Sequence, residues 1–179
     1  MAFTDVFVDP SRASNVGTGT TGDPYGDLQY ALDSESHDKT NGQRFGIMAG
    51  TAEILASGGI DLSTYLTASS LTTFSLAAPL VFQGCTAAGA FDGTKGEIDL
   101  STSNIVYDDA AMDYLHFVDL TFGSGTASTT NGNIIGGDNG FRLSRCDFVG
   151  CSCTSGNCAL VDLDGSDYIH DCRFLDVLM

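Results

Sequence analysis

A repeat of about 26 residues constrains this sequence more than any other feature. The aligned positions are apolar, and each of three sets recurs at this spacing: Phe122, Phe148 and Phe174; Leu120, Cys146 and Cys172; Phe117, Leu143 and Ile169. Three apolar positions that coincide over three units are hard to obtain by chance. A period of roughly 20–50 residues is typical of solenoid proteins, in which each repeat stacks on the next.

Alternation within each unit indicates β-strands. The charged residues Arg145 and Asp147 alternate with Cys146 and Phe148. A period of two places successive side chains on opposite faces of a strand, whereas a helical repeat needs a spacing of about 3.6 residues. The sequence therefore predicts an all-β parallel β-helix with coils of about 26 residues, in which the three apolar sets stack as ladders.

The N-terminal third has a different pattern. A short apolar strand around Val8 precedes a turn-rich loop, and Asp23-Pro24 has the form of a helix N-cap followed by proline at the first helical position. We expect this helix to end near Ser36 and a strand to pass through Phe45 and Ile47.

The length and charge limit the domain number and the partners. A chain of 179 residues is expected to form a single domain over 1–179, with a capping segment in 1–50 and coils in 51–179. Its 23 acidic and 7 basic residues give a net charge of −16, which disfavours nucleic acids and anionic membranes. No apolar run approaches the ~20 residues of a membrane span. The N-terminus lacks the basic and apolar regions of a signal peptide, so we expect a cytoplasmic or virion location.

Several short motifs resemble the N-terminal segment of right-handed parallel β-helix proteins, the pectin-lyase-like group: Val8-Asp9-Pro10, Gly17-Thr18-Gly19, Leu28-Gln29-Tyr30-Ala31-Leu32 and Gly50-Thr51-Ala52-Glu53. This resemblance implies a right-handed β-helix with an N-terminal capping strand and short helix. The group includes polysaccharide lyases, hydrolases, epimerases, and phage tail and surface proteins, so the resemblance defines a fold better than an activity.

One row of outward-facing side chains could contact a sugar. His116, Arg142 and Tyr168 follow one another at the spacing of the repeat, so they would form a line of polar and aromatic side chains across neighbouring coils. Ordinary exterior positions are the alternative. The asparagine, histidine and arginine motifs typical of pectin hydrolases are missing, and we assign no catalytic residue.

Calcium is one cofactor that the sequence suggests. Asp162, Asp164 and Asp167 lie close together around a glycine turn, and carboxylate oxygens are suitable calcium ligands. The alternative is a solvated turn, with no cofactor at all.

The cysteines leave three alternatives open. All six could be free thiols, a loop disulfide could join Cys151 or Cys153 to Cys158, or four thiols could bind zinc. The six cysteines are Cys85, Cys146, Cys151, Cys153, Cys158 and Cys172.

Only the short segment 175–179 follows Phe174, so the last coil is expected to be uncapped. Solenoids need capped ends, and an open coil favours association. We expect self-association, or docking of another virion or surface protein, through this coil. The function that follows is a structural and interaction protein of a virion, either a phage tail fiber or spike or a capsid surface decoration, with glycan binding as a further role. The alternative is a carbohydrate-active enzyme, a polysaccharide lyase or hydrolase, or a carbohydrate-binding module.

Overall fold

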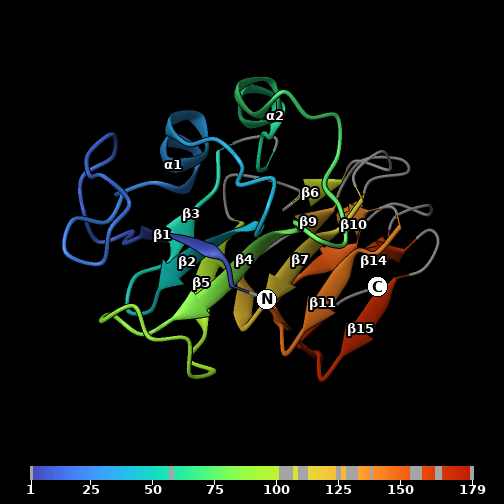
Figure 1. Cartoon of the computed structure of the whole chain (residues 1–179). Helices are drawn as coiled ribbons and strands as arrows, with labels where there is room; N and C mark the ends of the chain where they lie inside the picture. The colour runs from blue at the N-terminus through green and yellow to red at the C-terminus, as the bar shows by residue number, and fades with distance from the viewer. Residues whose placement is uncertain are drawn as a thin grey trace.

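The computed structural model describes residues 2–56, 59–100, 107–108, 113–123, 126–127, 133–137, 139–153, 159–163 and 167–177. Two helices and sixteen strands lie in these residues (Figure 1). In chain order they are β1 (Thr4–Val8), α1 (Leu28–Ser34), β2 (Gln43–Met48), β3 (Glu53–Ile54), α2 (Ser63–Ser69), β4 (Leu80–Cys85), β5 (Gly96–Asp99), β6 (Tyr107–Asp108), β7 (Leu115–Val118), β8 (Leu120–Gly123), β9 (Thr126–Ala127), β10 (Asn133–Gly137), β11 (Arg142–Ser144), β12 (Asp147–Val149), β13 (Ser152–Cys153), β14 (Ala159–Leu163), β15 (Tyr168–His170) and β16 (Arg173–Leu175).

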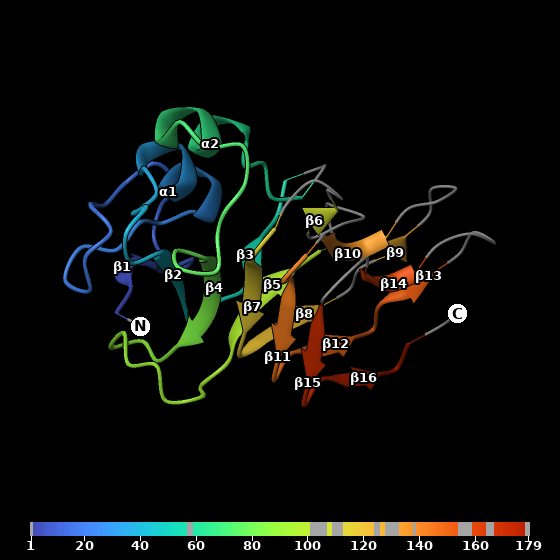
Figure 2. The same ribbon diagram turned by 45° about the vertical axis from the view of Figure 1, so that its right-hand side comes forward.

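Parallel sheets dominate the architecture. The largest sheet has six strands in the order β1-β2-β4-β7-β11-β15, and a second has five in the order β16-β12-β8-β5-β3. Smaller sheets contain β14-β10-β6 and β13-β9. Figure 2 shows the six-stranded sheet with α1 and α2 beside each other at one end of it. These sheets are built from pairings between segments that are distant in the sequence.

The prediction of an all-β, right-handed parallel β-helix with regular coils is wrong. The structure is α/β-like, with parallel sheets accompanied by short helices. Thr4 pairs with Gln43, and Gln43 pairs with Leu80, so both of these connections are longer than the repeat. In the described strands, the repeat spacing holds in the C-terminal part, where β7, β11 and β15 are in register.

The longer connections explain this correction. Those between β1, β2 and β4 contain α1 and α2, whose buried side chains include Leu28, Leu32 and Tyr65. Burial of these apolar groups holds the helices against the sheets, although α2 (Ser-Thr-Tyr-Leu-Thr-Ala-Ser) is poor in strong helix formers. Tertiary packing therefore forms a helix that the repeat pattern did not indicate.

The first helix begins later than expected. Its N-cap is Asp27, whose side chain accepts a hydrogen bond from the Tyr30 amide, and not Asp23. The reason is that Tyr25 pairs with β1: its amide donates to the Phe7 carbonyl at 2.9 Å. This pairing keeps the chain extended past Pro24. The expected strand through Phe45 and Ile47 is present as β2.

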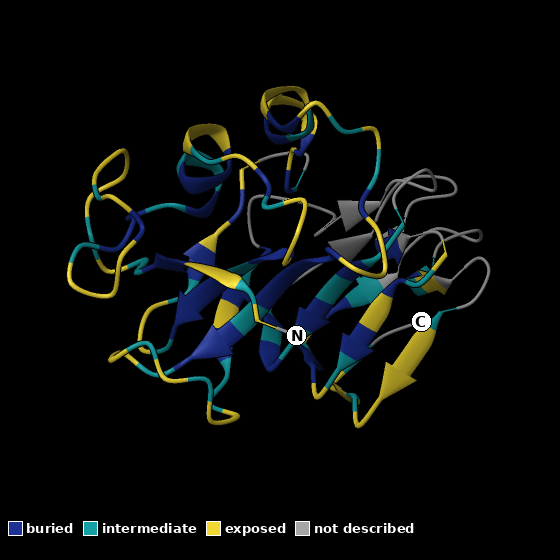
Figure 3. Cartoon of the chain, in the orientation of Figure 1, coloured by how far each residue is buried: buried dark blue, intermediate teal, exposed yellow. Residues whose placement is uncertain are grey.

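Apolar side chains from the parallel strands stack in the interior. Phe122 and Phe148 have ring centroids 5.0 Å apart, and Phe148 and Phe174 are also 5.0 Å apart. Leu143 lies in register between Phe117 and Ile169. Burial falls towards the last strands, as Figure 3 shows for β15: Phe148 is fully buried, whereas Phe174 is 46% exposed.

Candidate functional site

The structure brings the predicted row of His116, Arg142 and Tyr168 together. His116 pairs in register with Arg142, and Arg142 pairs with Tyr168. The guanidinium carbon of Arg142 lies 5.5 Å from the centre of the Tyr168 ring, within the range of a cation–π contact. The Tyr168 ring also stacks on His170, with centroids 5.7 Å apart. Three strands thus place aromatic and hydrogen-bonding groups on one line.

The histidine of this row is neutral at physiological pH. Burial, helped by the positive charge of Arg142, lowers the pKa of His116 to about 4. A neutral imidazole can both donate and accept a hydrogen bond. The row therefore offers one permanent cation, one neutral imidazole and an exposed ring, a set suited to hydroxyl groups or to a carboxylate.

The predicted calcium ligands are only partly described. Asp162 is exposed on β14, and Asp164 lies outside the described residues. Asp167 Oδ1 accepts a hydrogen bond from the Phe141 amide at 3.0 Å, which ties together two segments remote in the chain. No group of three or more His, Cys, Asp or Glu side chains suited to a metal ion is found in the described part of the chain. Calcium binding stays a prediction.

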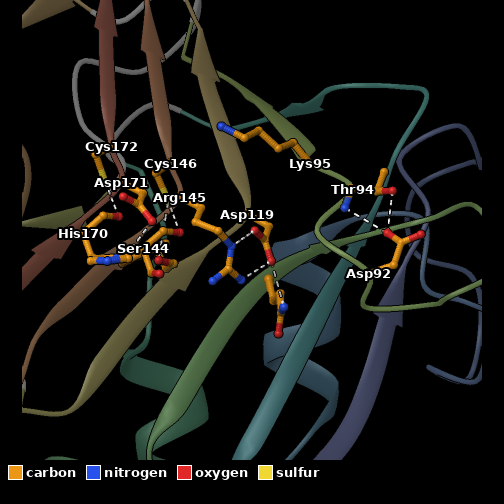
Figure 4. A network of polar contacts seen from close by, with 12 residues as sticks. Asp92, Thr94, Lys95, Asp119, Ser144, Arg145, Cys146, His170, Asp171 and Cys172 are labelled. Carbon is orange, nitrogen blue, oxygen red and sulfur yellow. Dashed lines mark hydrogen bonds and ion pairs between the residues drawn. The ribbon is translucent and has the colours of Figure 1, made fainter.

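A recurring backbone turn organises the polar groups between the two largest sheets. Asp119, Arg145 and Asp171 each have a φ of 51–54° and each separate a strand of the six-stranded sheet from a strand of the five-stranded sheet. Left-handed backbone is uncommon outside glycine. We call these three residues the corner residues (Figure 4).

The first two corner residues form a partly buried ion pair. Arg145 donates through Nε and Nη2 to the two carboxylate oxygens of Asp119, at 2.6 and 2.7 Å. Gln83 Nε2 donates to Asp119 Oδ2 at 3.0 Å. The Asp119 side chain is 1% exposed, so these contacts replace the water that a carboxylate needs. They also raise the pKa of Arg145.

A second ion-pair network surrounds Asp147, two residues beyond the corner. Lys95 Nζ lies 2.5 Å from Asp147 Oδ1, and Arg173 Nε donates to the same oxygen at 2.8 Å. The other Asp147 oxygen accepts a bond from Arg173 Nη2. Hydrogen bonding to Arg173, opposed by burial, lowers the pKa of Asp147.

Two cysteines adjoin the corner residues. Cys146 and Cys172 are free thiols directly after Arg145 and Asp171. Both side chains lie close together in Figure 4. The Cys146 thiol donates to the carbonyls of Phe117 and Ser144, and the Cys172 thiol donates to the carbonyl of His170. Cys85 and Cys151 are also buried. The loop disulfide and the zinc site both involve Cys158, which lies outside the described residues, as does the side chain of Cys153.

The sequence interpretation missed the corner ion pairs, although a signal was present. Asp119, Arg145 and Asp171 alternate in charge at the spacing of the repeat, and so do Asp147 and Arg173. Opposite charges on directly adjacent strands attract each other. A search for charge alternation at the apolar period would have found both networks.

One buried carboxyl group lies at a separate cavity of about 370 Å³, next to α1. Glu53 Oε1 accepts a hydrogen bond from the Leu28 amide at 3.1 Å. Burial, together with the nearby Asp27, raises the pKa of Glu53 to about 7. Its main contact caps the first turn of α1, so the group connects the helix to β3.

Comparisons with family models, with curated proteins and with solved structures found no match for this chain. Neither helix in the described residues is long and apolar enough to cross a membrane.

Proposed function

We propose that this chain is a structural and interaction protein that self-associates through β15 and β16, here called the terminal layer. The observation that supports this is the exposure of apolar side chains on both strands. Ile169 and Phe174 are 41% and 46% exposed, whereas Leu143 and Phe148, which pair with them, are fully buried. Tyr168 and Leu175 are exposed beside them. Contiguous exposed apolar groups favour a protein partner.

The apolar residues on either side of Asp171 and Cys172 favour a second copy of the chain as that partner. Two exposed apolar residues precede Asp171 and two follow Cys172. A two-fold axis between Asp171 and Cys172 would exchange β15 of one copy with β16 of the other. Ile169 would then cover Phe174 of the second copy, and Tyr168 would cover Leu175. Such self-complementarity is what a two-fold interface requires.

The virion setting of this function rests on the resemblance to phage tail and surface proteins and remains a prediction. The same holds for the alternative of a polysaccharide lyase or hydrolase. The exposed apolar side chains of the terminal layer support self-association, whether the chain belongs to a virion or acts on polysaccharides.

Sedimentation equilibrium of the whole chain over a wide concentration range tests the proposal. We expect a reversible monomer–dimer equilibrium. Ile169→Ser combined with Phe174→Ser should weaken dimerisation by about tenfold or more, because a loss of about 1.4 kcal/mol already has this effect. Leu76→Ser is the matched control, since Leu76 is 68% exposed in the α2–β4 connection and outside the terminal layer.

A wild-type chain that stays monomeric throughout would overturn the proposal. So would a dimer that the double substitution leaves unchanged. Circular dichroism of each variant shows whether a loss of association reflects a loss of folding.

The row of His116, Arg142 and Tyr168 supports glycan binding as a second candidate function. An exposed tyrosine ring next to a guanidinium can stack on a sugar and bond to its hydroxyl or carboxylate groups. Titration with neutral and acidic oligosaccharides, followed by NMR, tests this. We expect shifts at Arg142 and Tyr168 that Tyr168→Ala abolishes and that Tyr30→Ala preserves. An absence of saturable shifts with both sugar classes would exclude this candidate.

A further inference from the structure

We propose that Cys146 and Cys172 form an oxidisable dithiol site, in which a hydroperoxide oxidises Cys172 and Cys146 then closes an intrachain disulfide. Both sulfurs belong to one chain, so the disulfide forms within a monomer and needs no second copy. It assigns a chemical role to two residues that would otherwise serve only as small apolar fillers.

The strand register supports the geometry of this disulfide. The pairs Ser144–His170 and Asp147–Arg173 flank the two cysteines on either side. Cys146 and Cys172 therefore occupy equivalent positions in adjacent layers. Neighbouring strands are about 4.8 Å apart, which lies inside the usual Cα separation of a disulfide, about 4.4–6.8 Å. The bond needs no large backbone movement.

The surroundings make the two thiols different. The adjacent Cys146 thiol lowers the pKa of Cys172, and the charge of Lys95 acts in the same direction. The same contact and burial raise the pKa of Cys146. Cys172 is also partly exposed, whereas Cys146 is buried. Cys172 is thus the thiolate that a peroxide can reach, and Cys146 is its resolving partner.

The reaction balances in two steps. The Cys172 thiolate attacks one oxygen of the hydroperoxide, so an S–O bond forms, the O–O bond breaks, and the departing oxygen takes a proton to leave as an alcohol or water. Cys146 sulfur then displaces the hydroxyl group from Cys172 sulfur, and the Cys146 proton leaves with it as water. The two thiols lose two electrons, and the hydroperoxide gains them.

Cys85 lacks these features. It is fully buried, and burial raises its pKa to about 12. It should therefore stay reduced under conditions that oxidise Cys172. This contrast provides an internal control within the same molecule.

Peptide mass spectrometry after treatment with hydrogen peroxide tests the proposal, at chain concentrations low enough to keep the protein monomeric. We expect a peptide pair joined between Cys146 and Cys172 that has lost two hydrogen atoms. Cys146→Ser should instead accumulate a sulfenic acid at Cys172, detectable with a dimedone probe. Cys172→Ser should leave Cys146 reduced, and Cys85→Ser should behave like the wild type.

The pH profile of alkylation provides a second readout that a purely structural role would not change. In the wild type, iodoacetamide should modify Cys172 with a midpoint below the ordinary thiol pKa of about 8.5. In Cys146→Ala, which removes the neighbouring donor, the midpoint should move upwards, and the rate at pH 7 should fall by roughly tenfold. An unchanged midpoint, or a disulfide that maps to other cysteines or only between chains, would overturn the proposal.

Discussion

Side chains at the corner residues show how a buried charge is compensated by ion pairs and hydrogen bonds in this acidic protein. Asp119 is buried, yet it keeps a bidentate partner in Arg145 and an amide donor in Gln83. A buried carboxylate without a partner would be costly. Arg145 also adopts a left-handed backbone conformation, so its side-chain contact with Asp119 offsets an unfavourable local geometry.

Arg145→Met should lower the free energy of unfolding by about 1–3 kcal/mol, because it leaves the Asp119 carboxylate buried without its cation. This range is below that of a fully buried pair, since half of the Arg145 side chain is exposed. Arg142→Met is the control and should cost about 0.5 kcal/mol or less, because Arg142 is exposed. Urea denaturation measures both. Equal losses in the two variants would contradict the role of the ion pair.

Glu53 should make stability fall as the pH rises. The folded pKa of Glu53, about 7, exceeds its ordinary value of 4.5, so the folded chain binds the proton more tightly than the unfolded chain. Its stabilising contribution is complete below about pH 4.5 and is lost as the pH rises towards 7. Glu53→Gln should remove this dependence and be more stable at pH 8 by on the order of 1–3 kcal/mol.

The measurement is the difference between wild-type and Glu53→Gln unfolding free energies from pH 4 to 8. A difference is needed because burial lowers the pKa of His37, and that group loses its stabilising contribution as the pH falls below about 6.5. The two effects have opposite signs. Parallel pH profiles for the two proteins would show that Glu53 does not titrate as expected.

At the scale of strands, residues at equivalent positions in successive layers contribute unequally to the free energy of unfolding. Phe148 on β12 packs between two other rings and is fully buried, whereas Phe174 on β16 has a ring on one side and solvent on the other. The value of an aromatic residue therefore depends on whether a layer covers it. The same pattern explains why the terminal layer can dock a partner without altering the interior.

Phe148→Ala should destabilise the monomer by about 3–5 kcal/mol, as expected for removal of a buried ring. Phe174→Ala should cost about 1 kcal/mol, because much of the ring is already in contact with water. Urea unfolding at low chain concentration compares the two. If Phe174→Ala proved as costly as Phe148→Ala, the terminal layer would be part of the core and not a docking surface.

At the scale of the molecule, a net charge of −16 opposes association between copies. Apolar contacts across the terminal layer must overcome this repulsion. Salt screens charges with a Debye length of about 10 Å at 0.1 M and about 3 Å at 1 M. Raising the salt concentration should therefore strengthen dimerisation, as measured by sedimentation equilibrium. Weaker association at high salt would mean that ion pairs dominate the interface.

The repeat indicated the parallel pairing of the C-terminal strands and predicted which side chains share a row, such as His116, Arg142 and Tyr168. It succeeded there because strands in register place residues of equal spacing side by side. It failed for the N-terminal part. There the local pattern suggested a helix start at Asp23, whereas pairing of Tyr25 with β1 moved that start to Leu28.

The sequence by itself determined the strand-forming alternation, the excess of negative charge and the spacing of the repeat, since these depend only on residue order. The tertiary structure decided that helices occupy the longer connections, that Asp119 is buried opposite Arg145, and that Cys146 lies beside Cys172. Each of these depends on burial and on the distance between segments remote in the chain. Those quantities exist only after the strands have paired, because desolvation and close approach arise from the packed layers and not from local composition.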